Sequence, residues 1–232
     1  MANFLLIHYA VIMRIWSATY CDVVIDVMMS LEMQDQWFLG IGSLVGSLQH
    51  HDLTPWEEDA DVVVHLRYRP RIQRALNNFS LSLERTRKNA EISSSLKEIV
   101  LNTHKFNLSD ISPLTYRPFD KLWYPAPRRP VSCLRIYHST KRHYCSSHTY
   151  SSDLEKRVSP KYMDCRELME RYAFVHRCPI PEQERNDKPI GFCDEHLVDG
   201  DGRSVHKIRT ALDPDEIDIP LYTVRHEAFK CP

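Results

Sequence analysis

Two aspartates placed two positions apart, Asp59 and Asp61, are the residues with the clearest capacity for chemistry. They enter an apolar run, Val62-Val63-Val64, which is typical of a buried strand. Residues two apart on a strand project from the same face, so the two carboxylates would repel each other. A divalent cation bound between them would remove this repulsion. The sequence therefore predicts a site for Mg²⁺ or Mn²⁺ with Asp59 and Asp61 as ligands.

A Gly-Ser pair, Gly42-Ser43, precedes a short segment that is compatible with a helix. Glycine permits a tight turn and a close approach of a ligand to backbone amides. Ser43 is able to cap the following helix, and the N-terminus of a helix attracts phosphate. A phosphate-binding turn followed by a metal-binding Asp-x-Asp suits chemistry on a nucleoside diphosphate, because a metal neutralises the phosphates and stabilises the leaving group.

Residues 42–62 carry a resemblance to a known family, and they read Gly-Ser-Leu-Val-Gly-Ser-Leu-Gln-His-His-Asp-Leu-Thr-Pro-Trp-Glu-Glu-Asp-Ala-Asp-Val. This stretch resembles the signature of the LicD/fukutin family, in which a glycine-containing turn is followed by a His, a Pro-Trp pair and alternating aspartates. Gln49 stands where Arg is usual, and Glu57 where the first Asp is usual. Residues 106–150 extend the resemblance through an Arg-Pro-Phe-x-x-Leu-Trp-x-Pro-x-Pro segment.

The resemblance implies an α+β, nucleotidyltransferase-like (polymerase-β-type) fold with a small mixed sheet flanked by helices. Family members transfer phosphocholine or ribitol phosphate from a CDP-linked donor to a glycan. For this chain it implies a metal-dependent transferase that uses a nucleotide-linked donor and a glycan or glycoprotein acceptor. Gly42, Ser43 and Arg117 are the expected donor-binding residues. A neighbouring acid, Glu57 or Glu58, is expected to take the proton of the acceptor hydroxyl.

The middle of the chain departs from the family pattern. The family places a further strand there, with an Asp as third metal ligand, but no such strand is expected between residues 65 and 105. Either Asp110, Glu57 or Glu58 substitutes for that Asp, or the chain is a catalytically degraded relative that acts as a non-enzymatic binding or accessory protein. A third interpretation treats the acids as a solvated turn of an unrelated α+β protein.

The elements that must position these residues follow from hydrophobic periodicity and turn signals. Helices are expected over residues 4–33, 43–50, 71–104 and 160–178, strands over 37–41 and 59–65, and a turn at Thr54-Pro55. The nucleotidyltransferase-like domain is predicted to span residues 1–178, and residues 179–232 are predicted to form a polar, weakly structured tail.

Composition and charge limit the kinds of protein that this chain can be. The chain has 232 residues, a hydrophobic content of 43% and a formal net charge of −1, which fits a globular domain and gives no reason to expect nucleic acid. The apolar N-terminal run, residues 4–13, is too short for a membrane span and is a poor match to a signal peptide. The resemblance implies a secretory-pathway enzyme, in the Golgi, with a membrane anchor, and an incomplete N-terminus would account for the missing anchor.

Cysteines and histidines are weaker candidates for metal binding or catalysis than the two aspartates. The seven cysteines include no Cys-x-x-Cys. His176, Cys178, Cys193 and His196 have a zinc-like spacing, but two separated pairs without other support are usually accidental. His50 and His51 are expected to hold the turn rather than to do chemistry, and Trp123 is expected to pack rather than to stack on a base or sugar.

Overall fold

A computed structural model describes most of the chain, and for some strand residues, among them residues 7–16 and Asp59, it describes only the backbone. The described residues are 7–16, 27–33, 35–56, 59–75, 78, 104–119, 122–135, 144–146, 150–151, 156–157, 159, 161–180, 192–212, 216 and 226–232.

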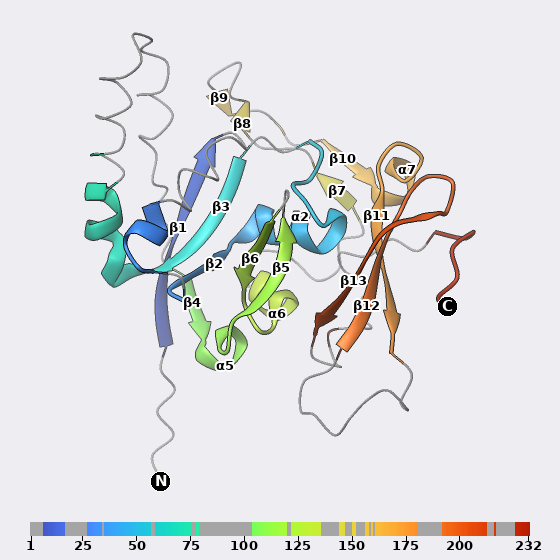
Figure 1. The fold of residues 1–232 in the computed structure, drawn as a ribbon. Helices are drawn as coiled ribbons and strands as arrows, with labels where there is room; N and C mark the ends of the chain where they lie inside the picture. Colours follow the sequence, from blue (N-terminus) through green and yellow to red (C-terminus); the bar gives the residue numbers. More distant parts are fainter. Residues whose placement is uncertain are drawn as a thin grey trace.

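An antiparallel four-stranded sheet with the order β2-β3-β1-β4 forms one side of the protein (Figure 1). Its strands are β2 (Trp37–Leu39), β3 (Asp59–His65), β1 (Ile7–Trp16) and β4 (His104–Asn107). The predicted strand over residues 59–65 is confirmed, but the helix expected over residues 4–33 is wrong for β1. Because β1 is a nearly continuous run of apolar and β-branched residues, its periodicity does not separate a strand from a helix.

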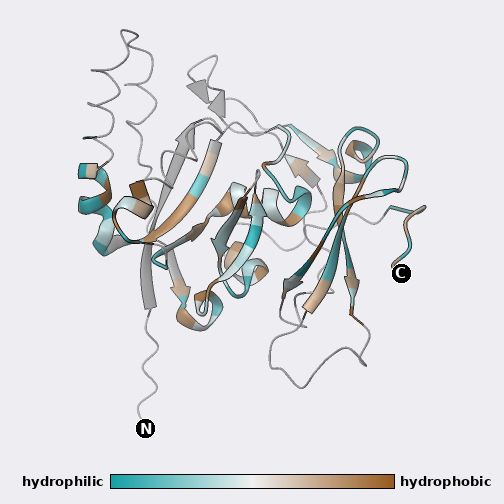
Figure 2. Ribbon diagram, viewed as in Figure 1, coloured by the Kyte–Doolittle hydropathy of each residue, from teal (hydrophilic) through white to brown (hydrophobic). Residues whose placement is uncertain are grey.

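Strand β3 is buried on both faces, which explains its continuous apolar sequence. Val62 and Val64 pack with Trp37 in the larger core, whereas Val63 packs with Phe38 on the other face. Figure 2 shows the hydrophobic colour that β2 and β3 share in the centre of the protein. The interpretation of Val62-Val63-Val64 as a buried strand is therefore confirmed.

Helix α2 (Ile41–His50) lies between the four-stranded sheet and a second, C-terminal sheet (Figure 1). It begins two residues earlier than predicted, its N-cap is Gly40, and no side chain caps it. The capping role expected for Ser43 is therefore wrong, because Ser43 lies inside the first turn and its hydroxyl is used elsewhere. The helix ends at His50 and is followed by the C-cap residue His51, which has a left-handed backbone with φ of 56°.

Gly46 allows the loop after α2 to pack directly on the helix. A Cβ atom at this position would lie 2.8 Å from the backbone nitrogen of Thr54 and 3.1 Å from the carbonyl carbon of Leu53. We expect Gly46→Ala to lower the free energy of unfolding by about 1–3 kcal/mol through overpacking, although alanine normally stabilises a helix by about 1 kcal/mol relative to glycine. A urea midpoint equal to or above that of the wild type would contradict this.

A β-hairpin packs against both α2 and the four-stranded sheet. Strands β5 (Thr115–Phe119) and β6 (Leu122–Ala126) pair antiparallel. Tyr124 is buried beside Trp37, with ring centroids 6.1 Å apart, whereas Trp123 is 52% exposed. The packing role predicted for Trp123 is therefore wrong, because the first two residues of β6 are exposed and only its last three residues are buried. Two short helices flank the hairpin, α5 (Leu108–Ile111) and α6 (Pro130–Leu134).

The C-terminal part forms an ordered antiparallel sheet where the sequence predicted a weakly structured tail. Its strands are β11 (Phe174–Pro179), β12 (Phe192–Val198) and β13 (Ser204–Ala211). A disulfide between Cys178 and Cys231 attaches the end of the chain to β11. The predicted boundary at residue 178 would fall within β11. These strands were missed because their polar residues satisfy one another in ion pairs, so the segment lacks an obvious apolar pattern.

Short elements complete the described chain. They are η1 (Leu66–Tyr68), β7 (Tyr144–Ser146), β8 (Tyr150–Ser151), β9 (Lys156–Arg157), β10 (Tyr162–Asp164) and α7 (Cys165–Leu168). The helix predicted over residues 160–178 is limited to α7, and a disulfide joins Cys145 to Cys165. Of the helix predicted over residues 71–104, residues 71–75 are helical, and most of the remainder lies outside the described residues. Within the described chain, no helix is long and apolar enough to cross a membrane.

Candidate functional site

The start of α2 and the aspartate strand are joined by three hydrogen bonds. The Gly40 N–H donates to the backbone oxygen of Asp61 at 2.8 Å, and the Asp61 N–H donates to Ser43 Oγ at 2.7 Å. The Gly42 N–H donates to the Asp61 carboxylate, Oδ2, at 3.1 Å. Asp61 is only 3% exposed. The structure thus brings together the Gly-Ser turn and Asp61, as the sequence predicted for one composite site.

Gly40 is the residue that permits this close approach. A Cβ atom on Gly40 would lie 2.9 Å from Val63 Cγ2 and 3.4 Å from the Cβ of Asp61. Any other side chain here would push the helix start away from β3. The ligand approach predicted at Gly42 is a different role and stays a prediction. The packing role of Gly40 was not predicted, although its position at the end of the apolar β2 run was an available signal.

The donor set of the site suits a hard divalent cation. Asp59 and Asp61 both belong to β3 and are two residues apart, but only the backbone of Asp59 is described. Carboxylate oxygens are the ligands that Mg²⁺ prefers, and the hydrogen bond from Gly42 orients the Asp61 carboxylate in the way outer-shell donors orient metal ligands. Asp61 therefore offers oxygen atoms that suit Mg²⁺ or Mn²⁺, and the pairing with Asp59 around an ion stays a prediction. Glu57 and Glu58 lie outside the described residues.

Asp110 does not lie with these aspartates. Asn107 pairs with Ile7 at one end of β1, whereas Asp61 pairs with Arg14 near the other end. Ile7 and Arg14 are separated by roughly 23 Å at about 3.3 Å per residue along an extended strand. Asp110 follows Asn107 and accepts a hydrogen bond from its amide at 3.2 Å. Of the alternatives for the third carboxylate, Asp110 is therefore ruled out, because the sheet register separates it from Asp61.

Arg117 is buried against α2, where it contacts Ser47, one helical turn after Ser43. Its guanidinium is 1% exposed and donates to the Glu195 carboxylate at 2.6 Å, to Ser47 Oγ and the Ser47 carbonyl at 3.2 Å, and to Thr210 Oγ1 at 3.4 Å. Ser47 Oγ in turn donates to the carbonyl of Pro118 at 2.7 Å. The donor-binding role of Arg117 stays a prediction, and these buried contacts favour a structural role.

Glu195 is the centre of a buried ion cluster that the sequence did not reveal. It is 0% exposed and contacts Arg117 at 2.6 Å, Arg177 Nε at 3.0 Å and His51 Nε2 at 3.1 Å. Burial alone would raise the pKa of Glu195, but Arg117, His51 and Arg177 together hold this pKa below its usual range. Glu195 is therefore ionised, and it ties β12 to α2, β5 and β11.

The two histidines at the end of α2, His50 and His51, have structural partners, as expected for residues that hold the turn. Burial lowers the pKa of His51 despite its hydrogen bond to Glu195, so His51 is neutral. With Nε2–H donating to Glu195, its Nδ1 accepts from His206 Nδ1 at 3.0 Å. His50 Nδ1 donates to the carbonyl of Ala173 at 2.8 Å.

The Pro-Trp pair of the motif anchors the loop. Trp56 Nε1 donates to the carbonyl of Ser146 at 2.9 Å, and its ring contacts His50 and Tyr172 at centroid distances of 5.6 and 5.8 Å. This fixes the path of the chain just before residues 57–58 and β3. The tryptophan therefore positions the aspartate strand and has no need of a chemical role.

Comparison with known families agrees with this arrangement. The fold and the site define a mixed α/β protein in which a glycine-led helix start meets a strand with two aspartates. Residues 34–90 match the family model described as LicD/FKTN/FKRP, nucleotidyltransferase domain. Residues 34–90 thus carry a LicD/fukutin-family domain, and a domain of this family suggests a phospho-alcohol transferase. Comparisons with curated proteins and with solved structures gave no match.

Proposed function

We propose that this protein is a metal-dependent transferase that moves a phospho-alcohol, of the phosphocholine or ribitol phosphate type, from a CDP-linked donor to a glycan acceptor. The observation that carries the proposal is the contact of the Gly42 N–H with the Asp61 carboxylate at 3.1 Å. This contact places a helix N-terminus, where phosphates bind, beside a carboxylate suited to a divalent cation.

The residues of the site have separate roles in this proposal. Asp59 and Asp61 hold Mg²⁺ or Mn²⁺, and Gly42 and Ser43 at the start of α2 position the donor diphosphate. The cation, when bound, supplies charge neutralisation of the diphosphate and of the departing CMP. Glu57 or Glu58 takes the proton of the attacking hydroxyl. The enzyme works in the secretory pathway, in the Golgi, on a glycan or glycoprotein, and an anchor N-terminal to this sequence would attach it to the membrane.

Thermal unfolding with CDP and Mn²⁺ tests the donor site. A ligand at a hundred times its dissociation constant stabilises the folded state by about 2.7 kcal/mol. For a domain of this size the expected increase in melting temperature is about 5–10 °C. We expect this increase to require both CDP and Mn²⁺ and to disappear in Asp59→Asn and in Asp61→Asn.

Asp110→Asn is the matched control, because it removes a carboxylate at the far end of the sheet. We expect its melting temperature to rise with CDP and Mn²⁺ as much as that of the wild type. If the melting temperature of the folded wild type does not rise with CDP and Mn²⁺, the enzyme proposal is wrong. If the rise is lost in Asp110→Asn, the register of β1 and β4 is contradicted.

The second candidate is a catalytically degraded relative that acts as a binding or accessory protein. Two observations favour it: the sheet register removes Asp110 from the site, and Asp61 is only 3% exposed. CDP binding separates the two candidates, because a degraded donor site would not be stabilised by CDP and Mn²⁺.

A further inference from the structure

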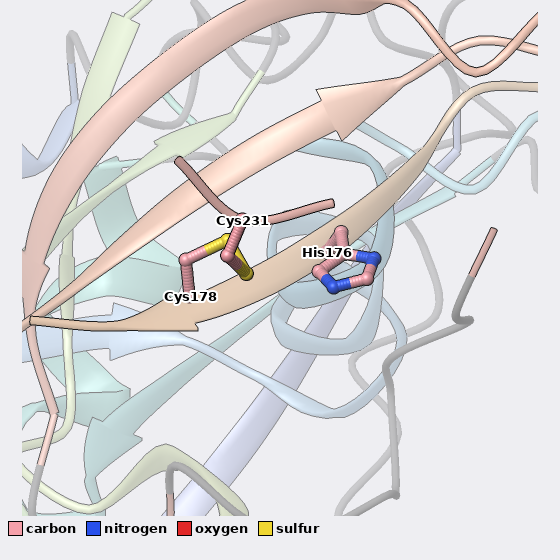
Figure 3. A group of neighbouring side chains, drawn as sticks. All are labelled: His176, Cys178 and Cys231. Atoms are coloured by element: carbon pink, nitrogen blue, oxygen red, sulfur yellow. A yellow bond between two sulfur atoms is a disulfide. The ribbon is translucent and has the colours of Figure 1, made fainter. Parts of the chain in front are cut away.

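The outer face of the C-terminal sheet gathers two histidines and a disulfide. His176 and Cys178 are two residues apart on β11, and His196 on β12 lies directly opposite His176. All three therefore project from one face of the sheet. Cys231, near the end of the chain, is bonded to Cys178 and lies beside His176 (Figure 3). Cys193 projects from the opposite face and is fully buried, so it does not belong to this group.

The group has nearly the dimensions of a metal site. The ligand atoms of His176, Cys178 and Cys231 lie within 4.8 Å of one another. With Zn–S bonds of about 2.3 Å and Zn–N bonds of about 2.0 Å, the ligand atoms of a tetrahedral zinc site are about 3.3–3.8 Å apart. Shifts of about 1 Å would therefore bring these atoms to coordinating distances.

His196 lies outside the set of three residues whose ligand atoms are within 4.8 Å of one another, but it stands opposite His176 on the same face and offers a fourth nitrogen that would move toward the ion. Its side chain is 4% exposed, its Nδ1 lies 3.0 Å from Ser204 Oγ, and its Nε2 has no hydrogen-bond partner. If Nδ1–H donates to Ser204, the lone pair is on Nε2, which is the pattern of metal-bound histidines held by an outer-shell partner. The ring of Phe229 covers both histidines, at centroid distances of 4.9 Å from His176 and 5.1 Å from His196.

We propose that reduction of the Cys178–Cys231 disulfide converts this cluster into a zinc site with the ligands His176, Cys178, His196 and Cys231. A dithiol reductant gives two electrons and two protons to the S–S bond and becomes a disulfide itself, which leaves two thiols on the protein. Zn²⁺ then forms two Zn–S bonds and releases both thiol protons.

The position of Cys231 makes this exchange feasible. Cys231 is exposed and lies outside the strands of the sheet, so a reductant can reach the bond and the sulfur can move without disturbing the sheet. In either state the C-terminal segment stays attached to β11, by a disulfide under oxidising conditions and by a metal under reducing ones. The cluster therefore holds the C-terminal segment against β11 by either a disulfide or a metal ion. It is independent of the proposed transferase site.

Cobalt spectroscopy on the full chain tests this proposal. The protein is reduced with dithiothreitol, freed of the reductant under anaerobic conditions and titrated with Co²⁺, followed by Zn²⁺. We expect the absorption bands of tetrahedral, thiolate-bound Co²⁺ at one ion per chain, and their loss on addition of Zn²⁺. The oxidised protein should give no such bands.

Variants identify the ligands. We expect Cys231→Ser to weaken zinc binding by more than about a hundredfold and His176→Ala by at least about tenfold, in line with losses of ten- to a hundredfold even for outer-shell partners. A double Cys145→Ser/Cys165→Ser variant is the matched control, since it removes the other disulfide, and it should keep the cobalt bands. Absence of tetrahedral bands in the reduced wild type, or unchanged bands in Cys231→Ser, would overturn the proposal. Loss of the native circular dichroism on reduction would overturn it as well, because the site needs the folded sheet.

Discussion

Replacing Glu195 with alanine is expected to lower the free energy of unfolding by about 3–5 kcal/mol, the cost of breaking a buried ion pair on one side. Glu195 is 0% exposed and lies between Arg117 and Arg177, which are 1% and 7% exposed. Without the carboxylate, two guanidinium groups would remain buried with no anion between them. The loss of stability therefore comes mainly from the unpaired arginines rather than from the glutamate itself.

Chemical denaturation measures this effect, and the neighbouring Asp194 provides the control. Asp194 lies on the outer face of β12 and pairs with Lys207 and Arg209, each at 2.8 Å, whose side chains are about half exposed. Because solvent screens such pairs, we expect Asp194→Ala to cost about 1 kcal/mol or less. Equal effects of Glu195→Ala and Asp194→Ala would show that the buried cluster does not form.

The buried cluster also explains how the C-terminal sheet is joined to the rest of the protein. Glu195 on β12 contacts His51 at the end of α2 and Arg117 on β5. Its replacement should therefore loosen the C-terminal sheet before the four-stranded sheet. Hydrogen exchange of β12 and β13 amides in Glu195→Ala should increase more than that of β3 amides.

The sequence predicted those parts of the site that are defined by short-range contacts. The Gly42–Asp61 hydrogen bond spans 19 residues, and both partners lie within one recognisable motif. The buried strand β3 was predicted because its apolar run is bounded by turn residues. A local pattern was sufficient for both features.

The long-range features could not be predicted in this way. Glu195 lies 78 residues from Arg117 and 144 from His51, and nothing local distinguishes it from the exposed acids around it. The same applies to Asp110, whose distance from Asp61 depends on the pairing of β1 with both β3 and β4. From sequence alone, a charged residue in a polar segment is predicted to be exposed, because its buried partners come from distant parts of the chain.

His50 is expected to make the protein lose stability as the pH falls from neutral to acid. Its Nδ1–H donates to the Ala173 carbonyl at 2.8 Å, and its ring packs on Phe174 with centroids 4.5 Å apart. Its Nε2 is buried with no hydrogen-bond partner, so a proton added there would be a buried, unpaired charge. Burial accordingly lowers the pKa of His50 from 6.5 to about 4.

Between pH 6.5 and about 4 the unfolded chain therefore binds a proton at His50 that the folded protein does not. Stability from this group is fully present above pH 6.5 and decreases as the pH falls, by about 3 kcal/mol at pH 4. Denaturation at several pH values should show a smaller decrease in His50→Asn than in the wild type, whereas His226→Asn, at the C-terminal segment, should keep the full decrease. If His50→Asn lost as much stability as the wild type between pH 7 and 4, the ring would have to be protonated in the folded protein. The packing of His50 against Phe174 and the carbonyl of Ala173 would then be wrong, and with it the position of α2 against β11.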